Sequence, residues 1–175
     1  MALREIVRYP DPVLLGRAEE VGEIDTDVRR LVADLVETMH AAPGVGLAAN
    51  QIGVARRVAV IDLSVGKDPS QLLVLINPRV LALEGSQAEE EGCLSIPGIT
   101  EVVERPAVVE VEAIGLDGKA LRIRGEALMA RALLHEIDHL NGVVFIQHLS
   151  PLKHRLARRK IQKLIRTGEW AAVGS

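Results

Sequence analysis

Cysteine and aromatic residues are scarce in this 175-residue sequence, which has one cysteine, one tryptophan, one tyrosine and one phenylalanine. A single cysteine excludes a disulfide within the chain. So few aromatic side chains cannot form a stacking platform for nucleic-acid bases, and we expect no sequence-specific binding to nucleic acid. The hydrophobic core must therefore be built from aliphatic side chains.

Long apolar runs are also missing, because even the stretch from Gln71 to Ala82 is interrupted by Asn77, Pro78 and Arg79. A helix that spans a bilayer needs roughly 20 consecutive apolar residues. The N-terminal residues lack the basic and apolar segments of a secretion signal. We therefore expect a cytoplasmic protein without a membrane partner.

The composition is otherwise that of a globular domain, with 48% hydrophobic residues, 26% charged residues and a formal net charge of -3. The charge is uneven, since the segment from His148 to Arg166 holds seven lysines or arginines and no acidic residue. We predict a single domain over residues 1–166, ending in a basic amphipathic helix over residues 151–166. Residues 167–175 are expected to form a frayed tail.

Hydrophobic spacing predicts three helices and several strands, which together indicate an α+β fold. The predicted helices are Asp25–Ala42, Gly125–Asn141 with Gly142 directly after it, and Pro151–Arg166. The predicted strands are 57–63, 72–76, 102–103, 107–114 and 121–124, with a hairpin turn at 116–119. We expect antiparallel or mixed sheets packed around the second helix, which would be the central metal-binding helix, with the third as a C-terminal helix.

The second helix carries the motif His135-Glu136-Ile137-Asp138-His139, in which two imidazoles lie one helical turn apart with a carboxylate between them. This spacing brings both histidines to one helix face and is typical of metal hydrolases. A catalytic metal normally has three protein ligands, and the motif supplies two. Downstream, Phe145 stands where a metzincin has its third histidine, and no glutamate occurs before Glu169.

Upstream, the single thiol, Cys93, lies in the segment Glu90-Glu91-Gly92-Cys93-Leu94-Ser95, between two groups of predicted strands. A thiolate and two neutral imidazoles would leave one open position on a four-coordinate metal. Cys93 is therefore the best candidate for the third ligand, with a buried and inert cysteine as the alternative.

A third segment, Gly44-Val45-Gly46-Leu47-Ala48-Ala49-Asn50-Gln51, is rich in small residues and ends in a side-chain amide donor. Small residues let a backbone lie beside a site, although such a run more often reflects tight packing. The segment lacks the Gly-Lys-Ser/Thr ending of a P-loop, so phosphate binding has no support.

Taken together, these three segments resemble the ordered motifs of the bacterial peptide deformylases. The resemblance extends to Tyr9-Pro10-Asp11-Pro12, to Ser95-Ile96-Pro97-Gly98 and to the stretch from His139 to Leu152, so it covers nearly the whole chain to about Arg166. It implies a metal-dependent hydrolase that removes the N-formyl group from the formylmethionine of newly made proteins and releases formate.

The resemblance also implies roles for individual residues. One divalent metal ion, typically Fe²⁺ in this family but with Zn²⁺, Ni²⁺ or Co²⁺ also compatible, would be held by Cys93, His135 and His139. Glu136 would take a proton from the attacking water and return one to the departing amine. The Gln51 amide and the backbone N–H of Leu94 would stabilise the oxyanion.

For the substrate, the resemblance implies an apolar slot for the methionine side chain, with Val45, Leu128 and Ala132 as candidates. Gly46 and Gly92 would pair with the peptide backbone as a neighbouring strand does. The substrate partner would be an N-formylmethionyl nascent polypeptide.

Three residues depart from the family's usual pattern. Leu134 stands where a glutamine commonly precedes the first histidine, and Ala127 replaces a usual glycine. Arg131 occupies a position at the pocket edge that is often apolar, and we expect it to change the tolerance for the second or third substrate residue. None of the three is an implied ligand or oxyanion donor.

The sequence leaves more than one interpretation open for Asp138, for the remaining histidines and for the basic helix. Asp138 is either a solvated helix charge or a partner of Arg105 that anchors the metal helix. His40, His148 and His154 have no matching partners in the sequence, so we interpret each as structural or exposed. The basic helix over residues 151–166 either has a solvated cationic face or docks on the ribosome, as the resemblance implies.

Two other functions remain open at this stage. One is a metalloprotease, which the missing downstream ligand disfavours. The other is a metal-stabilised ribosome-associated factor without catalysis, which would be expected to have lost Glu136 or Gln51, and both are present.

Overall fold

The computed structural model describes residues 2–170. Its α-helices are α1 (Thr26–Ala41), α2 (Ala127–Leu140) and α3 (Pro151–Arg166). Its strands are β1 (Gly46–Ala48), β2 (Val58–Ile61), β3 (Leu73–Glu84), β4 (Gln87–Cys93), β5 (Ile96–Arg105), β6 (Val108–Ile114) and β7 (Ala120–Glu126). Short 3₁₀ helices occur at Pro12–Leu14, Ala49–Ile52, Pro69–Gln71 and Phe145–His148.

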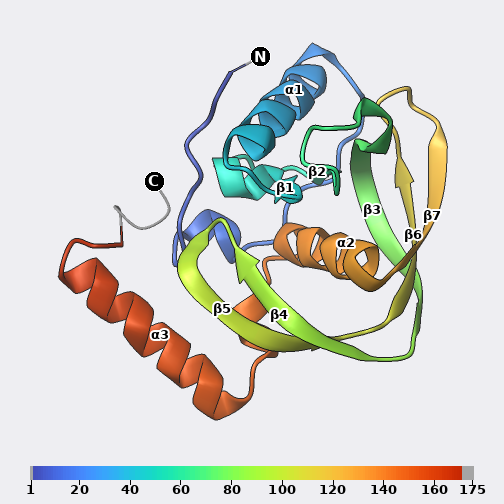
Figure 1. The fold of residues 1–175 in the computed structure, drawn as a ribbon. Helices are drawn as coiled ribbons and strands as arrows, with labels where there is room; N and C mark the ends of the chain where they lie inside the picture. The colour runs from blue at the N-terminus through green and yellow to red at the C-terminus, as the bar shows by residue number, and fades with distance from the viewer. Residues whose placement is uncertain (1, 171–175) are drawn as a thin grey trace.

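These elements form the predicted α+β fold, with α2 between two sheets (Figure 1). One sheet has five strands in the order β1-β2-β3-β6-β7, and the other pairs β4 with β5. All neighbouring strands in both sheets are antiparallel. The helix α3 lies outside this core, beyond the β4–β5 hairpin.

The three predicted helices form, and their ends have causes in the sequence. Asp25 caps α1 by accepting a backbone N–H of the first turn at 3.0 Å, and Ser150 does the same for α3 at 3.3 Å. Pro151 opens α3 because its missing N–H costs nothing at the first helical position. Gly142 follows α2 with a φ of 79°, a left-handed conformation that favours glycine, as predicted.

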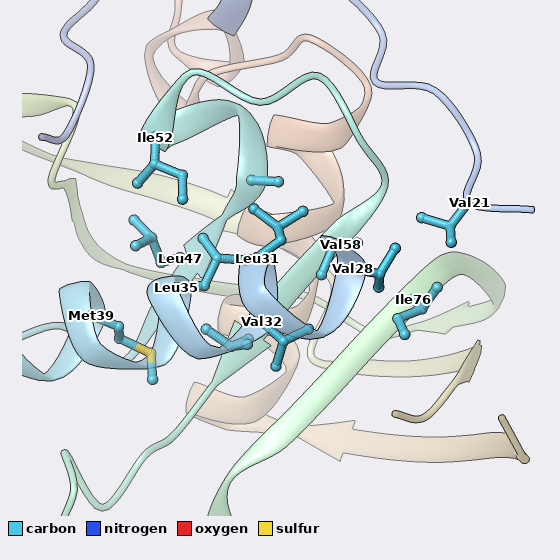
Figure 2. Close-up of a cluster of buried hydrophobic side chains, with 12 residues drawn as sticks. Val21, Val28, Leu31, Val32, Leu35, Met39, Leu47, Ile52, Val58 and Ile76 are labelled. Carbon is cyan, nitrogen blue, oxygen red and sulfur yellow. The ribbon is translucent and has the colours of Figure 1, made fainter. Parts of the chain in front are cut away.

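The largest hydrophobic cluster lies between α1 and the β1–β2–β3 side of the five-stranded sheet (Figure 2). The buried face of α1 consists of Val28, Leu31, Val32, Leu35 and Met39. Opposite it lie Leu47, Ile52, Val58 and Ile76, so the cluster is aliphatic, as the scarcity of aromatics requires. Burial of Leu47 and Ile52 anchors the small-residue segment that leads to the candidate site.

The prediction for β3 was too short, because it ended the strand at the Asn77-Pro78 interruption. The strand instead continues to Glu84 through an irregularity between Ile76 and Arg79, where Asn77 has a left-handed φ of 51°. The Asn77 side chain makes two 2.8 Å hydrogen bonds with the backbone of Val21, which hold the bend in place.

The segment around Cys93 was predicted to lie between strands, and this was also wrong. Cys93 is the last residue of β4, which pairs with the long β5. The strand signal was hidden because most of β4 is exposed and three of its seven residues are glutamates, so its residues do not alternate between apolar and polar.

The expectation of a frayed tail from residue 167 fails at Trp170. The indole is 7% exposed, packs in the cluster that contains Ile96 and Phe145, and donates from Nε1 to the backbone oxygen of Tyr9 at 2.8 Å. Residues 171–175 of the expected tail lie outside the described residues. Among residues 2–170, no helix is both long and apolar enough to cross a membrane.

Candidate metal centre

Three side chains suited to bind a metal converge between β4 and α2. The Sγ atom of Cys93 lies 3.2 Å from Nε2 of His139, which in turn lies 3.1 Å from Nε2 of His135. The three ligand atoms all lie within 4.8 Å of one another. A thiol and two imidazoles whose neighbouring atoms lie 3.1 and 3.2 Å apart form a donor set that fits a divalent cation.

Glu91 fixes the orientation of the His135 ring. Its Oε1 lies 2.5 Å from Nδ1 of His135, which leaves Nε2 facing Cys93 and His139. Burial alone would raise the pKa of Glu91, but hydrogen bonds from His135 and Arg105 lower it to about 2. The sequence reasoning gave Glu91 no role, although its place two residues before Cys93 puts both on one face of β4.

Arg105 on β5 connects Glu91 with the metal helix. The guanidinium, 4% exposed, donates to Glu91 at 2.6 Å and to Asp138 on α2 at 2.6 Å. The predicted pairing of Arg105 with Asp138 is thereby confirmed. Asp138 also lies 2.8 Å from Nε2 of His148, so that histidine has a structural contact, and the carboxylate anchors α2 rather than facing solvent alone.

Glu136 is buried beside the candidate ligands with unused hydrogen-bonding capacity. It is 4% exposed, and its Oε1 has no hydrogen-bond partner among residues 2–170. Burial raises the pKa of Glu136 to about 7, so the carboxyl group can both take and give a proton near neutral pH. A Cβ atom added at Gly46 would lie 2.6 Å from Oε2 of Glu136, so the close approach of β1 requires glycine.

The Gln51 side chain is held so that its amide nitrogen faces Cys93. Its Oε1 accepts the backbone N–H of Ala48 at 3.0 Å, which leaves Nε2 to donate. Nε2 lies 3.1 Å from Oγ of Ser95 and 3.6 Å from Sγ of Cys93. The small-residue segment therefore both packs tightly and delivers a fixed donor to the metal centre.

The two imidazoles have opposite protonation tendencies. Burial lowers the pKa of His139 well below its ordinary value, which keeps the ring neutral, as a metal ligand must be. Burial would also lower the pKa of His135, but hydrogen bonds with Cys93 and Glu91 raise it well above its ordinary value. Metal binding would therefore release a proton from this site.

A pocket of about 490 Å³ opens beside these groups. It is lined by all five residues predicted to bind substrate, namely Val45, Gly46, Gly92, Leu128 and Ala132. Gln51, Cys93, Leu94, His135 and Glu136 also line it, whereas His139 is fully buried. The structure thus brings every predicted site residue into the pocket or directly behind it.

The three departures from the family pattern have structural consequences. Leu134 is buried in the cluster between α2 and the five-stranded sheet, so an apolar residue suits its position. Ala127 has a φ of 50°, which explains why glycine is usual there. Arg131 lines the pocket, where its Nη1 donates to Oε1 of Gln87 at 2.6 Å.

A thiol and two imidazoles beside a buried carboxyl group, at the edge of an open pocket, define the site of a metal-dependent hydrolase. The family model for polypeptide deformylase matches residues 3–155. The chain therefore belongs to the peptide deformylase family, and its activity is the hydrolytic removal of the N-formyl group from newly made polypeptides.

Individual relatives agree with this assignment over nearly their whole length. A peptide deformylase of Acidobacterium capsulatum is 52% identical over 97% of this chain and 100% of its own. The crystal structure of a peptide deformylase from Legionella pneumophila has 44% identity and a TM-score of 0.89, covering 95% of this chain and 98% of its own. That of the Ehrlichia chaffeensis peptide deformylase in complex with actinonin has 38% identity and a TM-score of 0.85, covering 93% and 98%.

Proposed function

We propose that Cys93, His135 and His139 hold the divalent metal of this deformylase, with Glu136 as the group that moves protons. The convergence of three ligand atoms within 4.8 Å, directly beside a buried carboxyl group, carries the proposal. When bound, the cation supplies Lewis-acid chemistry, polarising the formyl carbonyl and lowering the pKa of water.

Glu136 takes a proton from the water molecule that attacks the formyl carbon. The bond between the formyl carbon and the methionine nitrogen then breaks, and Glu136 returns the proton to the departing amine. The products are formate and a peptide with a free N-terminus. A pKa of about 7 suits Glu136 to both transfers, because neither protonation state is strongly favoured near neutral pH.

The oxyanion formed during the attack needs hydrogen-bond donors whose positions are already fixed. Gln51 provides its Nε2, which the hydrogen bond from Ala48 to Oε1 keeps turned toward Cys93. The backbone N–H of Leu94, directly after Cys93, is the second donor. Each such donor typically lowers a barrier by roughly 3 to 4 kcal/mol.

Substrate placement follows from the walls of the pocket. Val45, Leu128 and Ala132 form the slot for the unbranched methionine side chain. Gly46 on β1 and Gly92 on β4 offer backbone groups on two sides of the peptide, without side chains that would hold it away. The peptide would lie between these strands with its formyl group at Cys93.

The metal we propose is Fe²⁺, with Zn²⁺, Ni²⁺ and Co²⁺ compatible with the same donor set. A thiolate beside ferrous iron is open to oxidation, which would release the metal. Metal analysis of protein purified without oxygen should find about one iron per chain, and exposure to air should reduce both iron content and activity together.

We assign catalysis to one domain, residues 1–166, acting in the cytoplasm, where nascent chains leave the ribosome. The exposed side of α3 carries Arg155, Arg159 and Lys163, which suit it to a phosphate-rich surface. At low salt, the wild type should sediment together with ribosomes. The Arg155→Glu/Arg159→Glu variant should stay in the supernatant, whereas the control variant Arg122→Glu on β7 should sediment like the wild type.

The direct test of the function is formate release from formyl-Met-Ala-Ser by anaerobically metallated protein. Unformylated Met-Ala-Ser and longer peptides with blocked N-termini serve as controls for proteolysis. Formate release without internal cleavage supports the deformylase. Internal cleavage would favour a protease, and a fully metallated wild type that releases no formate would contradict the proposal.

A further inference from the structure

Arg131 is the single arginine or lysine among the residues that line the pocket. It lies on the same side of α2 as Leu128 and His135, because residues three or four positions apart share a helix face, and Ala132 lines the same pocket. Its cation therefore lies on the same wall as the methionine slot and the metal ligand.

Gln87 holds this cation in one place. Its Oε1 accepts a hydrogen bond from Nη1 of Arg131 at 2.6 Å, and its Nε2 donates to the backbone oxygens of Pro106 and Ala127 at 3.0 and 3.1 Å. Because Gln87 is itself tied to two backbone groups, the guanidinium is fixed rather than free to extend into solvent. The remaining donors of a guanidinium can then serve a ligand without a large loss of side-chain freedom.

The two acidic residues that β4 contributes to the pocket are engaged elsewhere. Glu91 pairs with Arg105 and His135, and Glu90 accepts a hydrogen bond from the Thr100 hydroxyl at 2.7 Å. Neither carboxylate is hydrogen-bonded to Arg131 in the described part of the chain. Within residues 2–170, Arg131 is therefore hydrogen-bonded to the neutral amide of Gln87 and to no carboxylate.

The position of Arg131 along α2 indicates which part of a peptide it faces. Arg131 precedes His135 by one helical turn, about 6 Å along the helix axis. This separates the guanidinium from the formyl group beside His135. The first substrate residue is methionine, so a carboxylate that meets the guanidinium would belong to a residue that follows methionine.

We propose that Arg131 is a specificity-determining residue that favours a carboxylate side chain at the second or third position of the formyl peptide. The inference rests on the proposed function of the pocket and deepens it by naming the chemical class of the preferred substrates. A planar guanidinium can bind a carboxylate through two parallel hydrogen bonds, which neither Leu128 nor Ala132 can offer.

The test compares isosteric peptides that differ only in charge. We would measure kcat/KM for formyl-Met-Glu-Ser and formyl-Met-Ala-Glu, each against its glutamine counterpart and each with an amidated C-terminus, so that no terminal carboxylate can bind instead. The wild type should prefer glutamate about two- to fivefold at low salt at one or both positions, as a partly exposed ion pair allows. The preference should shrink at high salt.

Arg131→Leu and Arg131→Gln should reduce the ratio to about one, whereas Arg122→Leu, an exposed arginine on β7, should leave it unchanged. A wild-type ratio of one or less at both positions, or a preference that survives both Arg131 variants, would overturn the inference. The wild-type ratio is decisive even if a variant does not fold. Failure of the proposed function would look different, since neither the glutamate nor the glutamine peptides would release formate.

Discussion

At the residue scale, the close approach of β1 to α2 depends on the absence of a side chain at Gly46. A Cβ atom there would lie 2.6 Å from Glu136 Oε2, so Gly46→Ala must displace the carboxyl group. A displacement of about 1 Å at a catalytic group can cost about 100-fold in rate. We expect kcat/KM to fall by about that factor with metal content unchanged.

Gly22→Ala is the matched control for this variant, because no atom of residues 2–170 lies within 4 Å of a Cβ atom built at Gly22. It should leave kcat/KM near the wild-type value. If Gly46→Ala and Gly22→Ala had equal kcat/KM, the position of the Glu136 carboxyl group would not depend on glycine at position 46.

Ala127 carries backbone strain that a glycine would relieve. Ala127 has a φ of 50°, and an L-residue in this left-handed region costs roughly 1 to 2 kcal/mol. Glycine would relieve this strain, but its greater freedom in the unfolded chain offsets part of the gain. Ala127→Gly should therefore raise the free energy of unfolding by about 0.5 to 1 kcal/mol in a denaturant titration. Ala130→Gly, inside α2, should lower the free energy of unfolding by at least about 1 kcal/mol. If both variants lowered the free energy of unfolding, Ala127 would not be strained.

The candidate ligand residues and the pairing of Arg105 with Asp138 could be predicted from sequence, but the contacts of Glu91 and Gln87 could not. Histidine spacing on a helix is visible in one short segment, and Cys93 is the single thiol of the chain. Glu91 lies on β4, Arg105 on β5 and His135 on α2, so these side chains meet only in the folded chain. No local sequence pattern therefore predicts the bonds of Glu91 with Arg105 and His135. Gln87 was missed for the same reason, because its bond to Arg131 crosses from β4 to α2.

At the scale of elements, a metal held by Cys93 and two histidines would tie the end of β4 to α2. A ligand that binds only the folded state stabilises it in proportion to the logarithm of its concentration over Kd, by about 2.7 kcal/mol at 100 times Kd. Removing the metal with a chelator should lower Tm by several degrees, and adding Fe²⁺ back without oxygen should restore it.

Two variants separate this effect from catalysis. Glu136→Gln should show the same loss of Tm on chelation as the wild type, whereas Cys93→Ser should show little loss because it starts with less metal. If chelation lowered the Tm of Cys93→Ser as much as that of the wild type, Cys93 would not be a metal ligand.

Helices were more predictable than strands because amphipathic spacing and caps are local signals. Asp25, Pro151 and Gly142 mark helix ends in the sequence and do so in the structure. Most of β4 and the later part of β3 are exposed, so burial imposes no alternating pattern on them. Their pairing depends on partner strands and on the irregularity at Asn77, which the sequence does not specify locally.

At the scale of the whole molecule, Trp170 joins the C-terminal segment to the N-terminal one. Its indole fills the cluster between β5 and α3 and donates to the Tyr9 oxygen, while the Tyr9 N–H donates to the Ser95 oxygen near the site. Trp170→Ala should lower the free energy of unfolding by about 3 to 5 kcal/mol, the usual cost of removing a buried large aromatic.

Ile165→Ala provides the control, since its exposed side chain on α3 should contribute no more than about 0.5 kcal/mol. Denaturant titration of both variants measures the difference. If Trp170→Ala were as stable as Ile165→Ala, the tail would be frayed as the sequence suggested.

We propose that one group of residues binds the metal and a different residue moves the proton. Metal content and formate release, determined on the same anaerobic preparations of wild type, Glu136→Gln and Cys93→Ser, test it most directly. Glu136→Gln should keep about one metal per chain and lose at least about 100-fold in kcat, whereas Cys93→Ser should lose both. Near-normal formate release by metallated Glu136→Gln would contradict the account.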